Sequence, residues 1–320
     1  EAIKNVDVSG SVVYRYDNSD NEKGLGADKD RVDTNRYKIG LNLSSKVNDY
    51  VKFNSRFIVG SQTDGGFASL NAGKETNGGN ALAGIPNQNT RGNDGQADVS
   101  LSNAYFGFTA IPNTVVNIGK QGLTTPYTVA TDINGNEQTG TGILALSTFG
   151  PITAGAGYFN NSNVDVSGNG FVPTNKLALD GGSDMYVATV QGDLDFVKLE
   201  SWYVGMQDTF NTYTLAATSK IDLAENANLG LEARYVSLTL DNDYKNGLNS
   251  NLEKDNGMFR LAVDGKFSIV NARLAYTKTD KDGGLTALDQ DAKNTSLGWN
   301  ITSNGVADAD YFQAALGADI

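Results

Sequence analysis

Carboxylate and amide oxygens are the main candidates for site chemistry, because the chain contains no histidine and no cysteine. Their absence excludes Ser-His and Cys-His nucleophiles, thiolate metal sites and disulfides. The hard oxygen ligands that remain suit Ca²⁺. Asp132-Ile133-Asn134-Gly135 resembles a turn that could hold this ion, as could Asp165, although the sequence has no EF-hand or nonapeptide repeat. We therefore expect no required cofactor, with calcium as the candidate metal.

Composition and charge narrow the function classes further. No P-loop, Rossmann fingerprint or Ser-Lys arrangement stands out, so we do not expect an enzyme. The net charge of −12 argues against a nucleic-acid partner. The same charge fits either exposed, solvated loops or a pore that prefers cations, and composition alone does not choose between them.

Charged and apolar side chains alternate in segments along most of the chain. In one segment Tyr37, Ile39 and Leu41 share one parity, while Arg36 and Lys38 share the other. Alternation with a period of two predicts β-strands that have one apolar and one wet face. We count about 15 such strands and find no amphipathic helix. The sequence therefore predicts an all-β protein.

The connectors between these strands alternate between long and short. The long ones are rich in Gly, Asn, Asp and Ser: Asp17–Asn35, Gln62–Ala97, Gln121–Thr141, Asn160–Ser183, Asp241–Asn256 and Asp280–Lys293. The short ones are Lys46–Asp49, Pro112–Asn113, Gly150–Pro151, Asp193–Asp195, Asp222–Asn228 and Ser268–Ile269, and the connector near Gln207–Asn211 is a short exception in a long-loop slot. Long loops on one rim and short turns on the other are typical of outer-membrane β-barrels. A soluble sandwich also alternates, but it has no reason to keep this order.

A barrel also satisfies the demands of a bilayer. Every backbone N–H and C=O group in hydrocarbon needs a partner, and among sheets only a closed barrel provides one for each group. A tilted strand of about ten residues covers the apolar band of roughly 25 Å. We therefore predict a single domain over residues 1–320, a transmembrane antiparallel β-barrel with lipid on its apolar face.

The N-terminal residues resemble a known family. Glu1-Ala2-Ile3-Lys4-Asn5-Val6-Asp7-Val8-Ser9-Gly10, followed by Tyr14-Arg15-Tyr16-Asp17, is similar to the major outer membrane porin of Campylobacter and its relatives. Ile118-Gly119-Lys120-Gln121 and Gly140-Thr141-Gly142 resemble the same family, and the strand and loop order agrees over the whole chain. The resemblance implies a barrel of about 18 strands that is generally trimeric.

The resemblance also implies where the pore is narrowest. In this family the third long loop folds inward as a constriction, with bound calcium near it, and Gln121–Thr141 takes that place here with Asp132 and Glu137. Carboxylates inside a pore attract cations and repel anions, although both acids could equally be ordinary solvated loop residues. Opposite them we expect the bases of the inward parity, which a wet lumen alone would also explain: Arg15, Arg36, Lys38, Lys52, Arg56 and, nearby, Lys120.

We therefore expect a porin of the bacterial outer membrane. It would be a water-filled channel for passive diffusion of small hydrophilic solutes and ions, with lipid around it, a preference for cations and a homotrimeric assembly. The alternative is an adhesin or structural barrel that binds host or surface ligands through its long loops. An outer-membrane phospholipase or protease is disfavoured, because those chemistries depend on histidine.

The C-terminal residues depart from the family's pattern. A porin chain normally finishes with a strand whose last residue is aromatic, whereas this sequence stops at Ala315-Leu316-Gly317-Ala318-Asp319-Ile320. Single-chain bacterial barrels close with an even number of strands, and an open strand edge in lipid is prohibitive. We therefore expect about three further strands in the natural protein, to complete the barrel.

Overall fold

The computed structural model describes residues 5–20, 31–60, 67–69, 98–164, 179–247, 252–296 and 301–319. Backbone contacts divide the chain into two compact units. Unit 1 comprises Glu1–Asn48 and Lys52–Ala104, and unit 2 comprises Asp49–Val51 and Tyr105–Ile320. A single domain over the whole chain stays a prediction.

Unit 1 is built on antiparallel pairs of strands. Its strands are β1 (Val6–Asp20), β2 (Arg31–Lys46), β3 (Val51–Gly60) and the two-residue β4 (Ala68–Ser69). β1 pairs with β2 along its whole length, β3 pairs with the second half of β2, and β4 pairs with β2 at Arg36 and Tyr37. β5 (Asp98–Phe108) begins in unit 1 and ends in unit 2.

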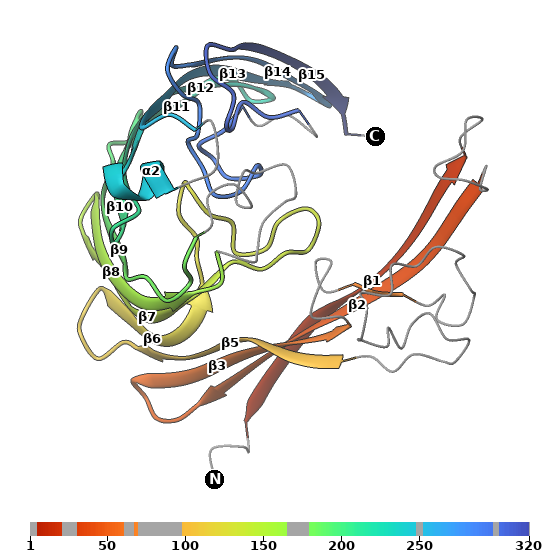
Figure 1. Cartoon of the computed structure of the whole chain (residues 1–320), viewed down its shortest axis with the longest axis vertical. Helices are drawn as coiled ribbons and strands as arrows, with labels where there is room; N and C mark the ends of the chain where they lie inside the picture. The colour runs from red at the N-terminus through yellow and green to blue at the C-terminus, as the bar shows by residue number, and fades with distance from the viewer. Residues whose placement is uncertain are drawn as a thin grey trace. The chain divides into compact units, whose positions relative to one another are not determined.

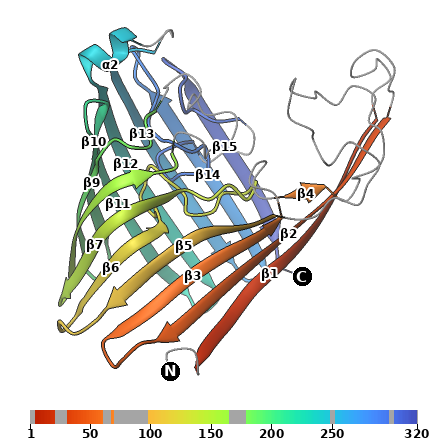
Figure 2. The ribbon, with the colours of Figure 1, turned by 60° about the horizontal axis from the view of Figure 1, so that its bottom comes forward.

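The described residues of unit 2 form ten further strands, each antiparallel to the next. They are β6 (Thr114–Gly122), β7 (Thr139–Phe149), β8 (Ile152–Ser162), β9 (Met185–Asp193), β10 (Lys198–Met206), β11 (Phe210–Ala224), β12 (Ala227–Leu240), β13 (Asp255–Phe267), β14 (Val270–Thr279) and β15 (Asp310–Ala318). Figure 1 shows these strands following one another around a curved sheet, and Figure 2 shows their common tilt. The predicted all-β, antiparallel fold is confirmed.

The connectors of unit 2 mostly keep the predicted lengths. Tight turns join the strands at Pro112–Asn113, Gly150–Pro151, Glu225–Asn226 and Ser268–Ile269, and Asn113, Gly150 and Ser268 have φ values of 54°, 56° and 55° there. One prediction is wrong. The connector was expected to end at Lys293, but among the described residues the next strand, β15, begins only at Asp310. A short helix, α2 (Asn242–Gly247), lies between β12 and β13.

The outer face of the unit 2 sheet is apolar, as the alternation predicts. On β13 the side chains of Phe259, Leu261 and Val263 are 41%, 45% and 41% exposed, while their neighbour Arg260 is buried. Large apolar side chains exposed in regular rows suit contact with lipid chains. Within the described parts of the chain, no helix has the length and apolar character needed to cross a membrane.

The inner face of unit 2 differs from the expectation of a uniformly wet surface. Val236, Leu238 and Leu240 on β12 share the parity of Glu232 and Arg234, and all three are buried. They belong to an apolar cluster that also contains residues of the β6–β7 and β14–β15 loops, among them Leu123, Tyr127, Leu285 and Leu288. Figure 1 shows these loops on the concave side of the sheet. The part of the inner wall around Val236, Leu238 and Leu240 is therefore a surface against which loops pack.

Candidate functional site

Two loops meet on the concave side of unit 2. The first inner loop is residues 123–138, between β6 and β7, and the second inner loop is residues 280–309, between β14 and β15, of which 297–300 lie outside the described residues. Leu288 N donates to Tyr127 O at 2.8 Å, and Asn294 N donates to Pro126 O at 3.0 Å. These backbone bonds join the two loops directly.

A buried polar junction ties both loops to the wall. Thr214 Oγ1 on β11 donates to the Tyr127 hydroxyl at 2.6 Å, and Asn294 Nδ2 donates to Thr214 Oγ1 at 2.8 Å. Arg234 on β12 donates to Asn294 Oδ1 at 3.2 Å. Tyr127 is 1% exposed, and burial raises the pKa of its hydroxyl to about 12. The hydroxyl therefore stays protonated and keeps its place in the junction at neutral pH.

Removing the Tyr127 hydroxyl tests this junction. We expect Tyr127→Phe to lower the free energy of unfolding by about 1 kcal/mol, because Thr214 loses an acceptor in a buried site. Denaturant unfolding of the folded protein measures the change. Tyr213→Phe, on the exposed outer face, is the control and should stay within about 0.5 kcal/mol of the natural protein. Equal losses in the two variants would contradict a specific role for Tyr127.

Three carboxylates come together where the two loops touch. Asp132 belongs to the first inner loop, Asp289 and Asp291 belong to the second, and an oxygen of each lies within 4.8 Å of the others. Asp132 Oδ1 accepts bonds from the backbone N–H groups of Asn134 and Asn136, both at 2.8 Å. Ile133 N donates to Asp291 Oδ2 at 2.9 Å, which links the two loops again.

Asp289 is the most deeply buried of the three acids. Its side chain is fully buried, and its Oδ1 accepts a bond from Asp291 N at 2.8 Å. Within the described segments, no N–H or O–H group donates to its Oδ2. Burial raises the pKa of Asp289 to about 7, and the charge of Asp132 adds to the effect. All three groups offer carboxylate oxygens, which are the ligands that a hard cation such as Ca²⁺ takes.

The structure places the predicted acids in different settings. Asp132 is 6% exposed, so it is turned into its own loop and not toward free solvent. Glu137 is half-buried, and its backbone oxygen accepts a bond from Asn163 Nδ2 at 2.6 Å. Asp165, the other predicted calcium ligand, lies outside the described residues. Asp289 and Asp291 were not predicted, although Asp289-Gln290-Asp291 repeats the Asp-x-Asx spacing of Asp132-Ile133-Asn134.

The predicted bases of the first three strands share one face of unit 1. Arg15 lies directly opposite Arg36, Lys38 is two residues along the same strand, and Arg56 lies opposite Asn42 and donates to it at 3.0 Å. The Arg15 guanidinium sits 4.3 Å from the centre of the Phe67 ring. Lys52 continues the parity of Arg56 on β3, and Lys120 is half-buried on β6, in unit 2. That these bases face the acids across a pore stays a prediction.

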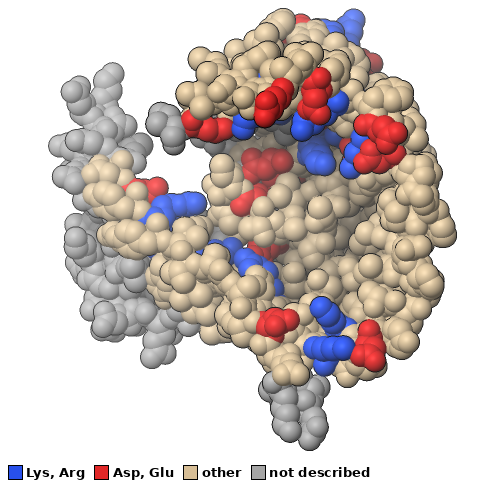
Figure 3. Space-filling view, turned by 180° about the vertical axis from the view of Figure 1, so that it is seen from behind, with Lys and Arg blue, Asp and Glu red and all other residues tan. Residues whose placement is uncertain are grey.

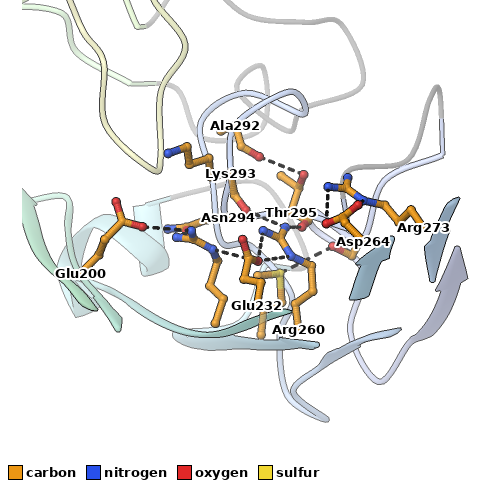
Figure 4. A network of polar contacts seen from close by, with 12 residues as sticks. Glu200, Glu232, Arg260, Asp264, Arg273, Ala292, Lys293, Asn294 and Thr295 are labelled. Carbon is orange, nitrogen blue, oxygen red and sulfur yellow. Dashed lines mark hydrogen bonds and ion pairs between the residues drawn. The ribbon is translucent and has the colours of Figure 1, made fainter. Parts of the chain in front are cut away.

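A network of charged side chains crosses the inner wall of unit 2 (Figure 4). Arg234 lies 3.5 Å from Glu200 and 3.5 Å from Glu232, and Arg260 lies 2.5 Å from Glu232. Asp264 and Arg273 form a separate, more exposed pair at 2.6 Å. Figure 3 shows acidic and basic residues close together in the hollow, while the curved flank carries few of them. Glu232, Arg234 and Arg260 alternate with apolar residues in the sequence, so their common face follows from that pattern, but their pairing depends on strand register.

The chain matches one family and several solved structures. The profile of the family described as Campylobacter major outer membrane protein matches residues 1–314. The Pseudomonas aeruginosa structure OccD3 (OpdP) is 15% identical with a TM-score of 0.60, covering 87% of this chain and 58% of that chain. OccK8 (OprE), from the same organism, is 14% identical with a TM-score of 0.70, covering 99% of this chain and 80% of that chain. No curated protein matches the chain.

The structural matches show the fold of the chain and the share of the similar proteins' length that it spans. At about 15% identity the structural matches show the fold alone, which is that of the OprD-type outer-membrane porins. The chain spans 58% of the length of OccD3 and 58% of the length of OprD, another similar structure from Pseudomonas aeruginosa. The predicted β-barrel class and the predicted location in the outer membrane are both confirmed.

Proposed function

Since the chain belongs to the Campylobacter major outer membrane protein family, we propose that it forms a water-filled channel across the outer membrane. The channel would carry small hydrophilic solutes and ions by passive diffusion, without enzymatic activity. The two-faced wall of unit 2 is the observation that carries this proposal. Its outer face is apolar and exposed, while its inner face keeps charged pairs such as Asp264 with Arg273, which are 48% and 36% exposed.

The two inner loops give this channel a means of restricting passage. They lie against the concave wall and are held there by the apolar cluster and the Tyr127 junction. Two similar Pseudomonas aeruginosa structures hold small organic acids, vanillate with OpdK and glucuronate with OccK2. Solutes of this size are therefore reasonable first probes of the channel.

Conductance in a planar bilayer tests the proposal. The full-length protein should produce discrete, long-lived current steps whose size grows with salt concentration, because ions would cross through water. Swelling of proteoliposomes in isotonic sugar or amino-acid solutions would then report which uncharged and charged solutes enter. A folded, membrane-inserted protein that gives neither current steps nor swelling would contradict the channel.

We further propose that the channel prefers cations because of acids near the inner loops, with Asp132 and Glu137 as the predicted pair. The bases that the sequence predicts at the pore constriction stay part of this proposal: Arg15, Arg36, Lys38, Arg56 and Lys120. Acids of distant loops contribute little, because the Debye length is about 8 Å at physiological salt. The homotrimer that the resemblance implies also stays a prediction.

Neutralising both acids tests the preference. With calcium chelated, Asp132→Asn combined with Glu137→Gln should lower the permeability ratio of K⁺ to Cl⁻ by about fivefold, since a nearby unit charge in water is worth about 1 kcal/mol at 4 Å. The reversal potential in a salt gradient measures this ratio. Asp243→Asn with Glu253→Gln removes the same charge from an exposed loop and is the matched control. Equal shifts in the two double variants would contradict the proposed pair.

We also propose that Ca²⁺ binds between the two inner loops, through Asp132, Asp289 and Asp291. Two observations support the proposal: the three carboxylates lie within 4.8 Å of one another, and the buried Oδ2 of Asp289 receives no donor among the described residues. A divalent ion would neutralise the cluster and supply the missing partner. Because its ligands come from both loops, the ion would also hold the loops together.

A further inference from the structure

One guanidinium group joins the channel wall to the second inner loop. Arg260 on β13 donates from Nε and Nη2 to Glu232 Oε1 at 2.8 Å and 2.5 Å. Its third nitrogen, Nη1, donates to the backbone oxygens of Lys293, at 2.7 Å, and of Thr295. The Arg260 side chain is 1% exposed (Figure 4). The Arg260 side chain of the wall therefore bonds to the backbone of the loop, and these bonds do not depend on the loop's side chains.

A second arginine supports the first. Arg234 lies 3.5 Å from Glu200 and 3.5 Å from Glu232, so Glu232 is shared between the two guanidinium groups. Arg234 also donates to Asn294 Oδ1 at 3.2 Å. Three successive residues of the loop, Lys293 to Thr295, are thus bonded to two arginines of the wall. The two acids and two arginines carry no net charge together.

This arrangement fixes position more than it adds stability. Buried ion pairs often contribute little net stability compared with well-packed apolar residues, because the charges lose their hydration. A planar guanidinium with five donors, however, imposes a defined geometry on whatever it bonds. The described parts of the second inner loop contain no helix or strand, so the loop depends on such contacts for its location.

We propose that Arg260, oriented by Glu232, is a positioning residue that sets how far the second inner loop projects from the wall and so sets the width of the passage. This inference rests on the proposed channel. Without Arg260 the backbone oxygens of Lys293 and Thr295 lose their donors and take water instead. The segment Ala292–Ser296 then moves away from the wall and samples several positions in the lumen.

Residues 1–320 contain no cysteine, which offers a clean way to follow this segment. Ser296 is 4% exposed and lies next to Thr295, so Ser296→Cys places a single buried thiol in the loop. We expect slow reaction of this thiol with a charged thiol reagent. Combining it with Arg260→Met should speed the reaction by about tenfold or more, because charged hydrogen bonds that hold the segment are lost.

Arg273→Met is the matched control for charge and strand location. Arg273 lies on β14 of the same wall and pairs with Asp264, and it donates no hydrogen bond to the described part of the second inner loop. It should leave the labelling rate of Ser296→Cys unchanged. Arg260→Lys keeps the charge, but a single ammonium cannot serve Glu232 and both backbone oxygens at once, so its labelling rate should be intermediate.

Single-channel recording completes the test. Arg260→Met should give conductance levels that differ from the natural one and fluctuate more, whereas Arg273→Met should give a steady level. Unchanged labelling in Arg260→Met, or equally fast labelling in Arg273→Met, would overturn the positioning role. If Arg260→Met fails to fold, the labelling rate of Ser296→Cys is measured in Arg260→Lys and Glu232→Gln instead, and a rate equal to that of Arg273→Met would overturn the positioning role. A third outcome separates the two proposals. If Arg260→Met speeds the labelling of Ser296→Cys and Arg273→Met does not, but the natural protein shows no conductance, the positioning role of Arg260 is supported and the channel is contradicted.

Discussion

Leu261→Arg is expected to lower the free energy of unfolding of the membrane-inserted protein by about 2–4 kcal/mol. Leu261 lies near the middle of β13 on the outer face, is 45% exposed, and is paired with Ala233 and Tyr276. An arginine there must put its charge into hydrocarbon or reach for the interface. Equilibrium unfolding from lipid vesicles in denaturant measures the loss.

The control for Leu261→Arg lies at nearly the same depth on the other face. Leu261 pairs with Ala233 on β12, and Ala233 pairs with Ala217 on β11. Thr218 follows Ala217 directly, so it lies at nearly the depth of Leu261 but on the inner face. Thr218 lies opposite Glu232, and an arginine there would have a carboxylate beside it. Thr218→Arg should therefore cost little. A similar cost on both faces would indicate that neither face meets lipid, and would contradict the membrane barrel.

The strand order of this fold could be predicted because period-2 alternation and connector length are local properties. The predicted turns at Pro112–Asn113, Gly150–Pro151 and Ser268–Ile269 lie where the structure has them. The inner apolar surface was harder to predict, although β12 carries a signal. Its apolar parity changes from Leu231 and Tyr235 to Val236 and Leu238. A change of parity within one strand indicates that each end of the strand packs against something different.

The inner loops show where prediction from the sequence stops. The chain reads as polar and glycine-rich around Gly283–Asn294, yet Leu285 and Leu288 are 1% exposed there and complete the apolar cluster. Their burial depends on contacts with Tyr127, about half the chain away, and such a pairing has no local signature. The same limit explains why Asp132 was predicted as a ligand without Asp289 and Asp291.

Asp289→Asn is expected to weaken calcium binding by at least about tenfold to a hundredfold, which is the range that loss of even an outer-shell partner costs. Asp289 contributes one of three carboxylates to the cluster, and calcium affinity depends on the number of ligand charges. Calorimetric titration of the calcium-stripped protein measures the affinity. Asp243→Asn removes an exposed acid of α2, outside the cluster, and should leave the affinity unchanged.

Calcium should also stabilise the natural protein more than it stabilises Asp289→Asn. A ligand that binds only the folded state adds about 2.7 kcal/mol when its concentration is a hundred times its Kd. Asparagine keeps the shape of the side chain and an oxygen that can accept the bond from Asp291 N, so the loop keeps its turn and the variant tests the charge. Equal stabilisation of both proteins by calcium would place the ion elsewhere, and the two inner loops would then be joined by their direct hydrogen bonds and by the apolar cluster, without a shared ion.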